Sequence, residues 1–486
     1  MAACYSQAVR IHNIKAGFST NSSSSHSILF FAPGQVPADD LVGVDGASTY
    51  GWSDFTLASP DAKMAYLGAQ IMLSLRDSVG ETLAARLASQ IVGAPVAADG
   101  YVDHQSAWVL PMAWDGRGPD LAFLTELAAM LRRDGVVVIG GNDNITGEYA
   151  GHPLLGAGPR ISAKLPTEGP GRPDSRPVAR RDPSGYWTLY YRATGGRIRL
   201  SLDPTTQAAT PTKAAAPDLV DLKITDYCPF DCPMCYQDST RTGRHADYAQ
   251  VQHTLRMLGD LRVFEVAIGG GEPTLHPKFA EIVDAAAMAH VVPNFTTKNV
   301  PYVSSTVGAA VIEKCGGFAV SVGRGDDVRQ LAAHVTGAAR EKLTVQHIVG
   351  MEAFRTQGVI TACAAAQIPL TLLGYKYTGR GAMHAKSLQR NPRPDGWIDD
   401  VKYVLADQGR WSSFKVAVDT VLADKFYDRL IAEGVPAWCL TRKDGQFSAY
   451  VDAVTGRVYP SSYEDHPGVA FSDAATFTAA YQGFGA

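Results

Sequence analysis

The chain has 486 residues, of which 46% are hydrophobic and 19% charged, and 44 basic side chains nearly balance 48 acidic ones. This composition is ordinary for a soluble globular protein and argues against a protein that coats nucleic acid. No apolar run approaches the roughly 20 residues needed to span a bilayer and no signal peptide is recognisable, so we expect a cytoplasmic protein without a membrane segment.

The first 204 residues predict a mixed α/β domain. Leu121–Arg132 has the apolar spacing of a helix, and the apolar run Gly135–Ile139 is typical of a strand. Three polar clusters, Thr20–Ser27, Asp103–Ser106 and Gly140–Asn144, are either ordinary turns or functional loops. We predict that this domain acts as a lid or in substrate binding.

A change in composition separates this domain from the rest of the chain. Gly156–Gly185 is rich in Pro, Gly and Arg and predicts a long surface loop or a partly disordered insert. Tyr186–Tyr191 and Arg197–Leu202 predict a hairpin. The Thr, Ala and Pro residues of 205–217 predict a linker, followed by a barrel over 218–394 and a C-terminal extension over 395–486 that completes it.

Short apolar runs alternate with amphipathic stretches after the linker, which predicts parallel βαβ units and a partial (β/α)6 TIM-like barrel. The expected strands are Leu219–Thr225, Val263–Ile268, Val291–Thr296, Phe318–Val322, Leu343–Val349 and Pro369–Tyr375. The expected helices are Tyr248–Leu261, Pro277–Ala289, Ser304–Lys314, Asp327–Ala339 and Ala353–Ala366. Chemistry in such a barrel collects on the loops that leave the carboxyl ends of the strands.

Three cysteines, Cys228, Cys232 and Cys235, follow the first of these strands as a CxxxCxxC loop. Thiolates suit an iron–sulfur cluster or zinc, and no fourth Cys or His lies at a matching short spacing. A closed structural zinc site would need that fourth ligand. Three ligands fit a cubane that keeps one iron open. The total of seven cysteines, an odd number, disfavours a disulfide framework.

A glycine-rich loop follows the second strand, with Gly269, Gly270 and Gly271 preceding Glu272 and Pro273. Glycines allow the backbone to approach a ligand closely, and a carboxylate can pair with a ligand ammonium group.

The two motifs together resemble those of the radical S-adenosylmethionine (SAM) superfamily, over about a third of the chain. Met234 departs from the pattern, because the family usually has an aromatic residue before the third cysteine. The resemblance implies a [4Fe–4S] cluster on the three cysteines, SAM bound at the glycine loop, and an electron donor such as flavodoxin or ferredoxin. It also implies that polar residues after the third and fourth strands lie near SAM, although they could equally be ordinary strand-end residues: Thr296, Thr297, Asn299 and Ser321.

The loop after the sixth strand offers Lys376, Tyr377, Arg380 and His384 at the expected barrel mouth. This set favours an anionic substrate, unless the loop is simply solvated. Cys439 is a candidate hydrogen-atom donor, and simple burial is the alternative.

Three functions remain open. The leading hypothesis is a radical SAM enzyme acting on a small molecule such as a nucleoside, sugar or amino-acid derivative in a biosynthetic pathway. The alternative is modification of a peptide, with the N-terminal domain holding a leader segment. A non-catalytic zinc or iron–sulfur redox sensor is disfavoured by the missing fourth ligand and by the glycine loop.

Overall fold

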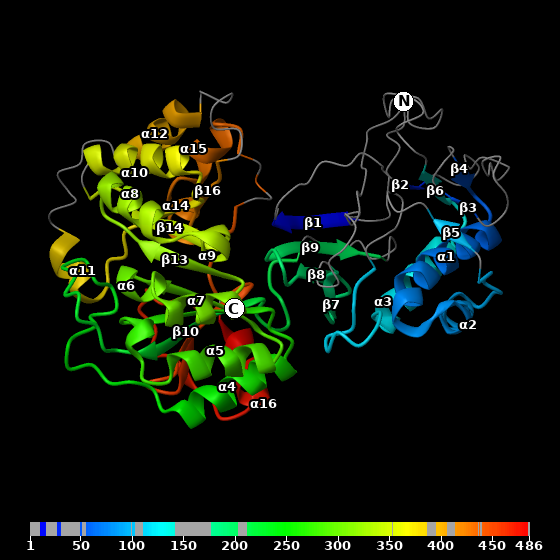
Figure 1. Cartoon of the computed structure of the whole chain (residues 1–486), viewed down its shortest axis with the longest axis horizontal. Coiled ribbons are helices and arrows are strands. Elements are labelled where there is room, and N and C mark those ends of the chain that lie inside the picture. Colours follow the sequence, from blue (N-terminus) through cyan, green and yellow to red (C-terminus); the bar gives the residue numbers. More distant parts are fainter. Residues whose placement is uncertain are drawn as a thin grey trace. The chain divides into compact units, whose positions relative to one another are not determined.

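The structure is a computed structural model that divides into two compact units, Met1–Pro211 and Thr212–Ala486 (Figure 1). It describes residues 10–15, 27–30, 49–50, 55–98, 100–102, 110–140, 176–202, 211–351, 353–385, 395–405, 414–435, 437 and 440–484. The polar clusters 20–27, 103–106 and 140–144 lie largely outside these residues. No helix among the described residues has both the length and the apolar character needed to cross a bilayer.

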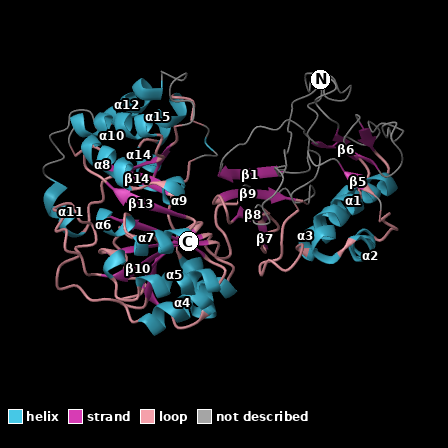
Figure 2. Ribbon diagram, viewed as in Figure 1, coloured by secondary structure: helices cyan, strands magenta, loops and turns pink. Residues whose placement is uncertain are grey.

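The N-terminal unit is mixed α/β with its own hydrophobic core (Figure 2). Its helices are α1 (Pro60–Val79), α2 (Glu81–Val92) and α3 (Leu121–Leu131). An antiparallel sheet has the order β1 (Arg10–Lys15), β9 (Gly196–Ser201), β8 (Trp187–Tyr191), β7 (Val178–Arg181). A second sheet contains β2 (Ser27–Phe30), β6 (Val136–Gly140) and β4 (Phe55–Leu57), and β3 (Thr49–Tyr50) pairs with β5 (Tyr101–Val102).

The C-terminal unit is built on one ten-stranded sheet. From one edge to the other its strands are β16 (Val416–Val418), β15 (Leu370–Leu373), β14 (Leu343–Ile348), β13 (Gly317–Ser321), β12 (Val292–Thr297), β11 (Glu265–Gly270), β10 (Leu219–Thr225), β17 (Ser448–Asp452), β18 (Arg457–Tyr459) and β19 (Val469–Ala470). All neighbours from β16 to β17 are parallel, and β18 and β19 add antiparallel pairs. The carboxyl ends of eight parallel strands therefore lie on one edge of the sheet.

Helices connect these strands and complete the core of the unit. They are α4 (Tyr248–Asp260), α5 (Phe279–Met288), α6 (Val300–Val303), α7 (Thr306–Lys314), α8 (Gly325–His334), α9 (Gly337–Glu341), α10 (Ala353–Ala366), α11 (Gly379–His384), α12 (Gly396–Leu405), α14 (Thr420–Lys425), α15 (Tyr427–Ala432) and α16 (Ala474–Gly483). Polar caps start several of them: Asp247, for example, accepts a hydrogen bond from the Gln250 amide at 3.1 Å at the start of α4.

The predicted fold class, a partial barrel after an α/β domain, is confirmed, with three differences. Two further parallel strands, β16 and β17, extend the six predicted ones on both edges. The helix expected over Asp327–Ala339 is two helices, because Val335 and Thr336 adopt extended backbone conformations between them. The stretch predicted as a loop over Gly156–Gly185 contains strand β7 near its end.

Candidate functional site

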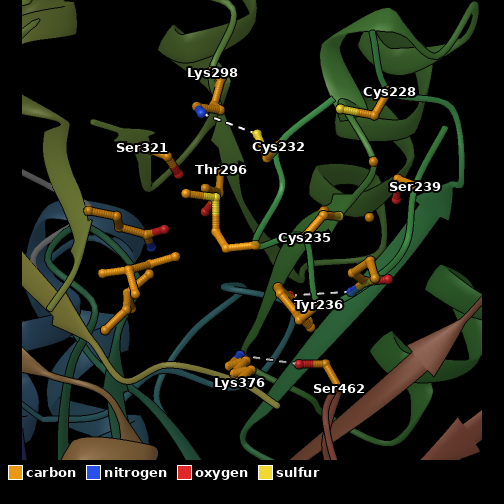
Figure 3. A pocket seen from close by; sticks show the side chains of 18 of the residues that line it. Cys228, Cys232, Cys235, Tyr236, Ser239, Thr296, Lys298, Ser321, Lys376 and Ser462 are labelled. Carbon is orange, nitrogen blue, oxygen red and sulfur yellow. Dashed lines mark hydrogen bonds between the residues drawn. The ribbon is translucent and has the colours of Figure 1, made fainter. Parts of the chain in front are cut away.

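A cavity of about 430 Å³ opens at the carboxyl ends of the parallel strands. Its walls come from the loops after β10 to β13 and from β14, β15 and β17 (Figure 3). Because neighbouring parallel strands end at the same edge, residues far apart in the sequence meet there. We call this space the central cavity.

The three cysteines of the CxxxCxxC loop line the central cavity as free, partly buried thiols. Backbone hydrogen bonds shape their loop, with the Cys228 amide donating to the Thr240 carbonyl at 2.9 Å and the Cys235 amide to the Cys232 carbonyl at 3.1 Å. Burial raises the pKa of the Cys228 thiol, and the neighbouring Cys232, Glu272 and Cys235 add to that rise. Lys298 Nζ lies 3.3 Å from Cys232 Sγ and donates a hydrogen bond to it.

The donor set fits a cluster better than a single ion. Within the described part of the chain, no three His, Cys, Asp or Glu side chains lie close enough together to hold one metal ion. The three thiols nevertheless share one cavity wall. Ligands of different irons in a cubane stand farther apart than ligands of one ion, so this arrangement suits a [4Fe–4S] cluster.

Arg380 lies against the cysteine loop and not on the wall of the central cavity. Its guanidinium donates to the Cys232 carbonyl at 3.2 Å and to the Ser239 carbonyl at 2.9 Å, and it pairs with Asp238 at 3.1 Å. Arg380 therefore binds three groups of the cysteine loop and stabilises its conformation; we call this contact a clamp.

The three glycines of the next loop differ in what surrounds them. A side chain on Gly270 would overlap the backbone at the end of β10, at Thr225, and one on Gly271 would overlap the backbone of the cysteine loop, at Tyr227. A Cβ on Gly269 would meet nothing within 4 Å. Two of the glycines thus allow two loops of the protein to pack together, and only Gly269 leaves open space for a ligand.

The buried carboxylate of Glu272 is largely occupied by donors from the protein itself. Its Oε1 accepts from the Thr274 hydroxyl at 2.6 Å, the Thr274 amide at 3.2 Å and the Thr297 hydroxyl at 2.6 Å. Its Oε2 accepts from the Lys298 amide at 3.0 Å. Of the two oxygens, only Oε2 retains room for a ligand ammonium group.

The other residues predicted near SAM divide into two groups. Thr296, Thr297 and Ser321 line the central cavity, as Glu272 and the three glycines do. Asn299 instead caps α6, accepting from the Tyr302 amide at 3.3 Å, and donates to the Thr274 hydroxyl at 3.0 Å. The first group therefore lines the central cavity, whereas Asn299 does not.

The residues predicted at the barrel mouth also lie in different places. Lys376 lines the central cavity. Tyr377 is 57% exposed and lines a neighbouring cavity, while His384 ends α11 and lines neither. Cys439 lies outside the described residues.

The sequence-based prediction missed several residues that line the central cavity. Asp221 and Lys223 of β10 both line the cavity, and Tyr236, His347 and Tyr450 join them. Burial raises the pKa of Asp221 to about 6, although Lys376 opposes that rise. The signal was present in the β10 sequence LVDLKIT, where two charged residues alternate with buried apolar ones and so share one face.

Comparison with known proteins agrees with this geometry. Residues 222–316, which run from the first strand through both motif loops, match the radical SAM superfamily. Residues 222–316 are a radical SAM domain.

Curated relatives match over short stretches of the chain. The mycofactocin maturase MftC of Mycobacterium ulcerans (strain Agy99) is 35% identical over 99 residues, which are 20% of this chain and 27% of that protein. A GTP 3',8-cyclase of Actinobacillus pleuropneumoniae serotype 3 (strain JL03) is 34% identical over 73 residues, 14% of this chain and 22% of that protein. The chain thus spans about a quarter of the length of these relatives.

Solved structures similar to this one include Streptococcus suis SuiB bound to its precursor peptide SuiA. That comparison has a TM-score of 0.41 at 14% identity and covers 56% of this chain and 67% of SuiB. A second is anSMEcpe with bound AdoMet and the Cp18Cys peptide, with a TM-score of 0.38 at 12% identity, covering 53% of this chain and 77% of that one.

Proposed function

We propose that this chain is a radical SAM enzyme whose substrate is a peptide. The observation that carries the choice of a peptide is a row of three adjacent cavities in the C-terminal unit. The central cavity shares Gly374, Tyr375 and Lys376 with a middle cavity of about 290 Å³. The middle cavity shares Val421, Lys425 and Tyr463 with an outer cavity of about 630 Å³.

The size of the central cavity supports an elongated substrate. Sites for one small ligand usually measure roughly 300–1,000 Å³, so about 430 Å³ is modest for SAM and a second molecule together. A substrate that approaches from the outer cavity would place its reactive group in the central cavity and leave the rest of its length outside. A peptide has that shape, whereas a nucleoside or sugar does not.

The chain's own residues would hold the cluster and SAM and exclude water from the site. Cys228, Cys232 and Cys235 would hold a [4Fe–4S] cluster, which would supply the electron that cleaves SAM to methionine and a 5'-deoxyadenosyl radical. Gly269 and the Oε2 atom of Glu272 would face the methionine part of SAM. The walls formed by β10 to β15 would keep water away from the radical.

The relatives are compatible with both substrate classes, since one is a maturase and another a GTP cyclase. The maturase match is the longer, at 99 residues against 73. Together with the row of cavities, it supports the peptide hypothesis over the small-molecule hypothesis that the sequence favoured.

The proposal is tested with the full chain, reconstituted without oxygen and supplied with SAM and dithionite. One sample receives a pool of synthetic peptides, and another receives a pool of nucleosides, sugars and amino-acid derivatives. We expect added peptides to raise 5'-deoxyadenosine formation and to change in mass. Changes confined to the small-molecule pool would contradict the proposal.

A further inference from the structure

Lys376 occupies the junction between the central and middle cavities and lines both. It lies in the loop between β15 and α11, and Arg380 of α11 is bound to the cysteine loop. In Figure 3, Lys376 and Ser462 lie at the opposite end of the cavity from Lys298 and Cys232, with Tyr236 between them. Any chain that passes from the middle to the central cavity would meet the Lys376 ammonium group.

Two aromatic rings and one hydroxyl surround this ammonium group. Its Nζ lies 4.4 Å from the centre of the Tyr236 ring and 4.8 Å from that of Tyr463. Ser462 Oγ, at 3.4 Å, is its one hydrogen-bond acceptor among the described residues. The faces of tyrosine rings stabilise a cation without accepting its directed N–H bonds.

The Lys376 ammonium group therefore has more hydrogen-bond donors than acceptors around it. It carries three N–H donors, and one of them is used by Ser462. No carboxylate of the described residues forms an ion pair with it, although ion pairs tie Lys223 to Asp226 at 2.5 Å and to Asp452 at 3.2 Å in the same region. A partly buried cation with two unused donors favours an anionic partner.

The surrounding acids restrict the charge of that partner. Burial lowers the pKa of Lys376, but Tyr236 and then Asp221, Asp419 and Asp444 act on it electrostatically, and the net result is a raised pKa. A phosphate dianion would be repelled by these carboxylates more strongly than a monoanion would. A carboxylate, with one charge and two acceptor oxygens, matches the site better.

We infer that Lys376, held between Tyr236 and Tyr463, binds a carboxylate group of the peptide substrate. The group is either an Asp or Glu side chain or the terminal carboxylate of the peptide. This inference rests on the proposed function, because it assumes that a peptide enters through the row of cavities. It assigns to Lys376 the selection of the substrate and its position relative to the central cavity.

The test measures which synthetic peptides the reconstituted, SAM-loaded holoenzyme retains, using mass spectrometry after gel filtration. Three pools of equal length are compared. The first has Asp and Glu and amidated C-termini, the second has free C-termini and no acidic residue, and the third has Asn and Gln in place of the acids and amidated C-termini. Retention is compared among the wild-type protein, K376M, K376R and K278M. Lys278, which pairs with Glu281 on the surface, is the matched control.

We expect the wild-type protein and K278M to retain the first or the second pool at least about tenfold better than the third, as a charge-assisted contact predicts. The pool that is preferred identifies the source of the carboxylate. K376M should bring the preference to within about twofold, and K376R should keep most of it. Iron content and circular dichroism, measured in each variant, establish that K376M is folded.

An unchanged preference in a folded K376M protein would overturn the inference. So would a wild-type protein that retains all three pools equally, although the proposed function would then stand. A wild-type protein that retains none of the pools would contradict the proposed function, and the inference would fall with it. If K376M loses its cluster, K376Q replaces it in the same comparison.

Discussion

Glu272 and its partners show how the site is held together by hydrogen bonds within the protein. The carboxylate accepts from side chain and backbone of Thr274, from Thr297 and from the amide of Lys298. It therefore ties the loop after β11 to the end of β12. A ligand contact through Oε2 is compatible with this network, but the network itself depends on the carboxylate.

Replacing Glu272 with Ala should leave the iron content unchanged, since no thiol is altered, but should weaken SAM binding and the fold together. Loss of these buried hydrogen bonds predicts about 2–4 kcal/mol of destabilisation, since water from the cavity replaces some of them. Urea unfolding and SAM titration measure the two effects. The exposed Glu281→Ala change is the control, with an expected cost below about 0.5 kcal/mol. Unchanged stability and SAM affinity in the Glu272 variant would contradict both roles.

Changing Cys228, Cys232 and Cys235 together to Ala should abolish cluster binding, because the described residues offer no other group of thiols in one cavity. Cys315 and Cys363 are buried, and burial raises the pKa of each thiol to about 12, so neither is a ready thiolate. Iron analysis and the visible absorbance of the reconstituted protein check this. The single change Cys315→Ala should keep the iron, and a triple variant that retains four irons would refute the assignment.

Asp221 should make stability depend on pH. Burial raises its pKa to about 6, so the folded state holds the proton more tightly than the unfolded state, whose Asp pKa is roughly 4. Its stabilising contribution is therefore complete below about pH 4 and is lost as the pH rises through 6. The loss is at most about 3 kcal/mol, since part of the group faces the cavity.

The variant Asp221→Asn should remove this dependence. The difference in unfolding free energy between the variant and the wild-type protein should move in favour of the variant between pH 4 and 7. Urea unfolding at several pH values measures it. A difference that stays constant over this range would show that Asp221 does not titrate there.

The elements that carry the site are fitted to one another through backbone contacts. The loop after β10 carries the cysteines, the loop after β11 carries the glycines, and the start of α11 lies against the first of these loops. The Gly271 amide donates to the Thr225 carbonyl at 2.7 Å, and the Gly381 amide donates to the Cys235 carbonyl at 3.3 Å. Three loops from separate strands are thus joined by backbone hydrogen bonds into one rim of the cavity.

Gly271→Ala should disrupt this rim, because the added Cβ would overlap the Tyr227 carbonyl and neither backbone can yield cheaply. We expect a loss of at least about 2 kcal/mol in stability and a lower iron content after reconstitution. Gly269→Ala is the matched control, since its Cβ would meet nothing within 4 Å, and it should keep both stability and iron. Equal behaviour of the two variants would refute the role of close packing.

The molecule as a whole contains two units, each with a separate hydrophobic core. The cysteine loop, the glycine loop and all three cavities belong to the C-terminal unit. Each unit therefore has the internal contacts that an independently folding domain requires. The predicted role of the N-terminal domain in substrate handling remains a prediction.

A protein that begins at Thr212 should fold and bind four irons, because its core does not draw on residues of the other unit. It should also cleave SAM slowly without substrate, while modification of an added peptide should be lost if the N-terminal domain handles the substrate. Circular dichroism, iron analysis and product mass measure these properties. Full peptide modification by the shortened protein would exclude that role.

Sequence alone identified the parts of this protein whose signal is local. The CxxxCxxC loop, the glycine loop and the six apolar strands can be recognised because each depends on a few neighbouring residues and on the period of side chains along a strand. The order of strand and helix also predicted that the motif loops would meet, since parallel strands end at one edge.

Tertiary structure decided what depends on residues distant in the chain. Lys376 contacts Tyr236 of the cysteine loop and also Ser462 and Tyr463, which lie more than 200 positions later in the chain. No local sequence pattern connects these residues. Likewise, Arg380 could not be distinguished from Lys376 by its sequence, since both are cations on one loop. Arg380 became a clamp because its guanidinium reaches three groups of the cysteine loop, whereas the Lys376 ammonium turns toward the cavities. Side-chain direction is set by packing across the whole sheet, and that packing is absent from any local stretch of sequence.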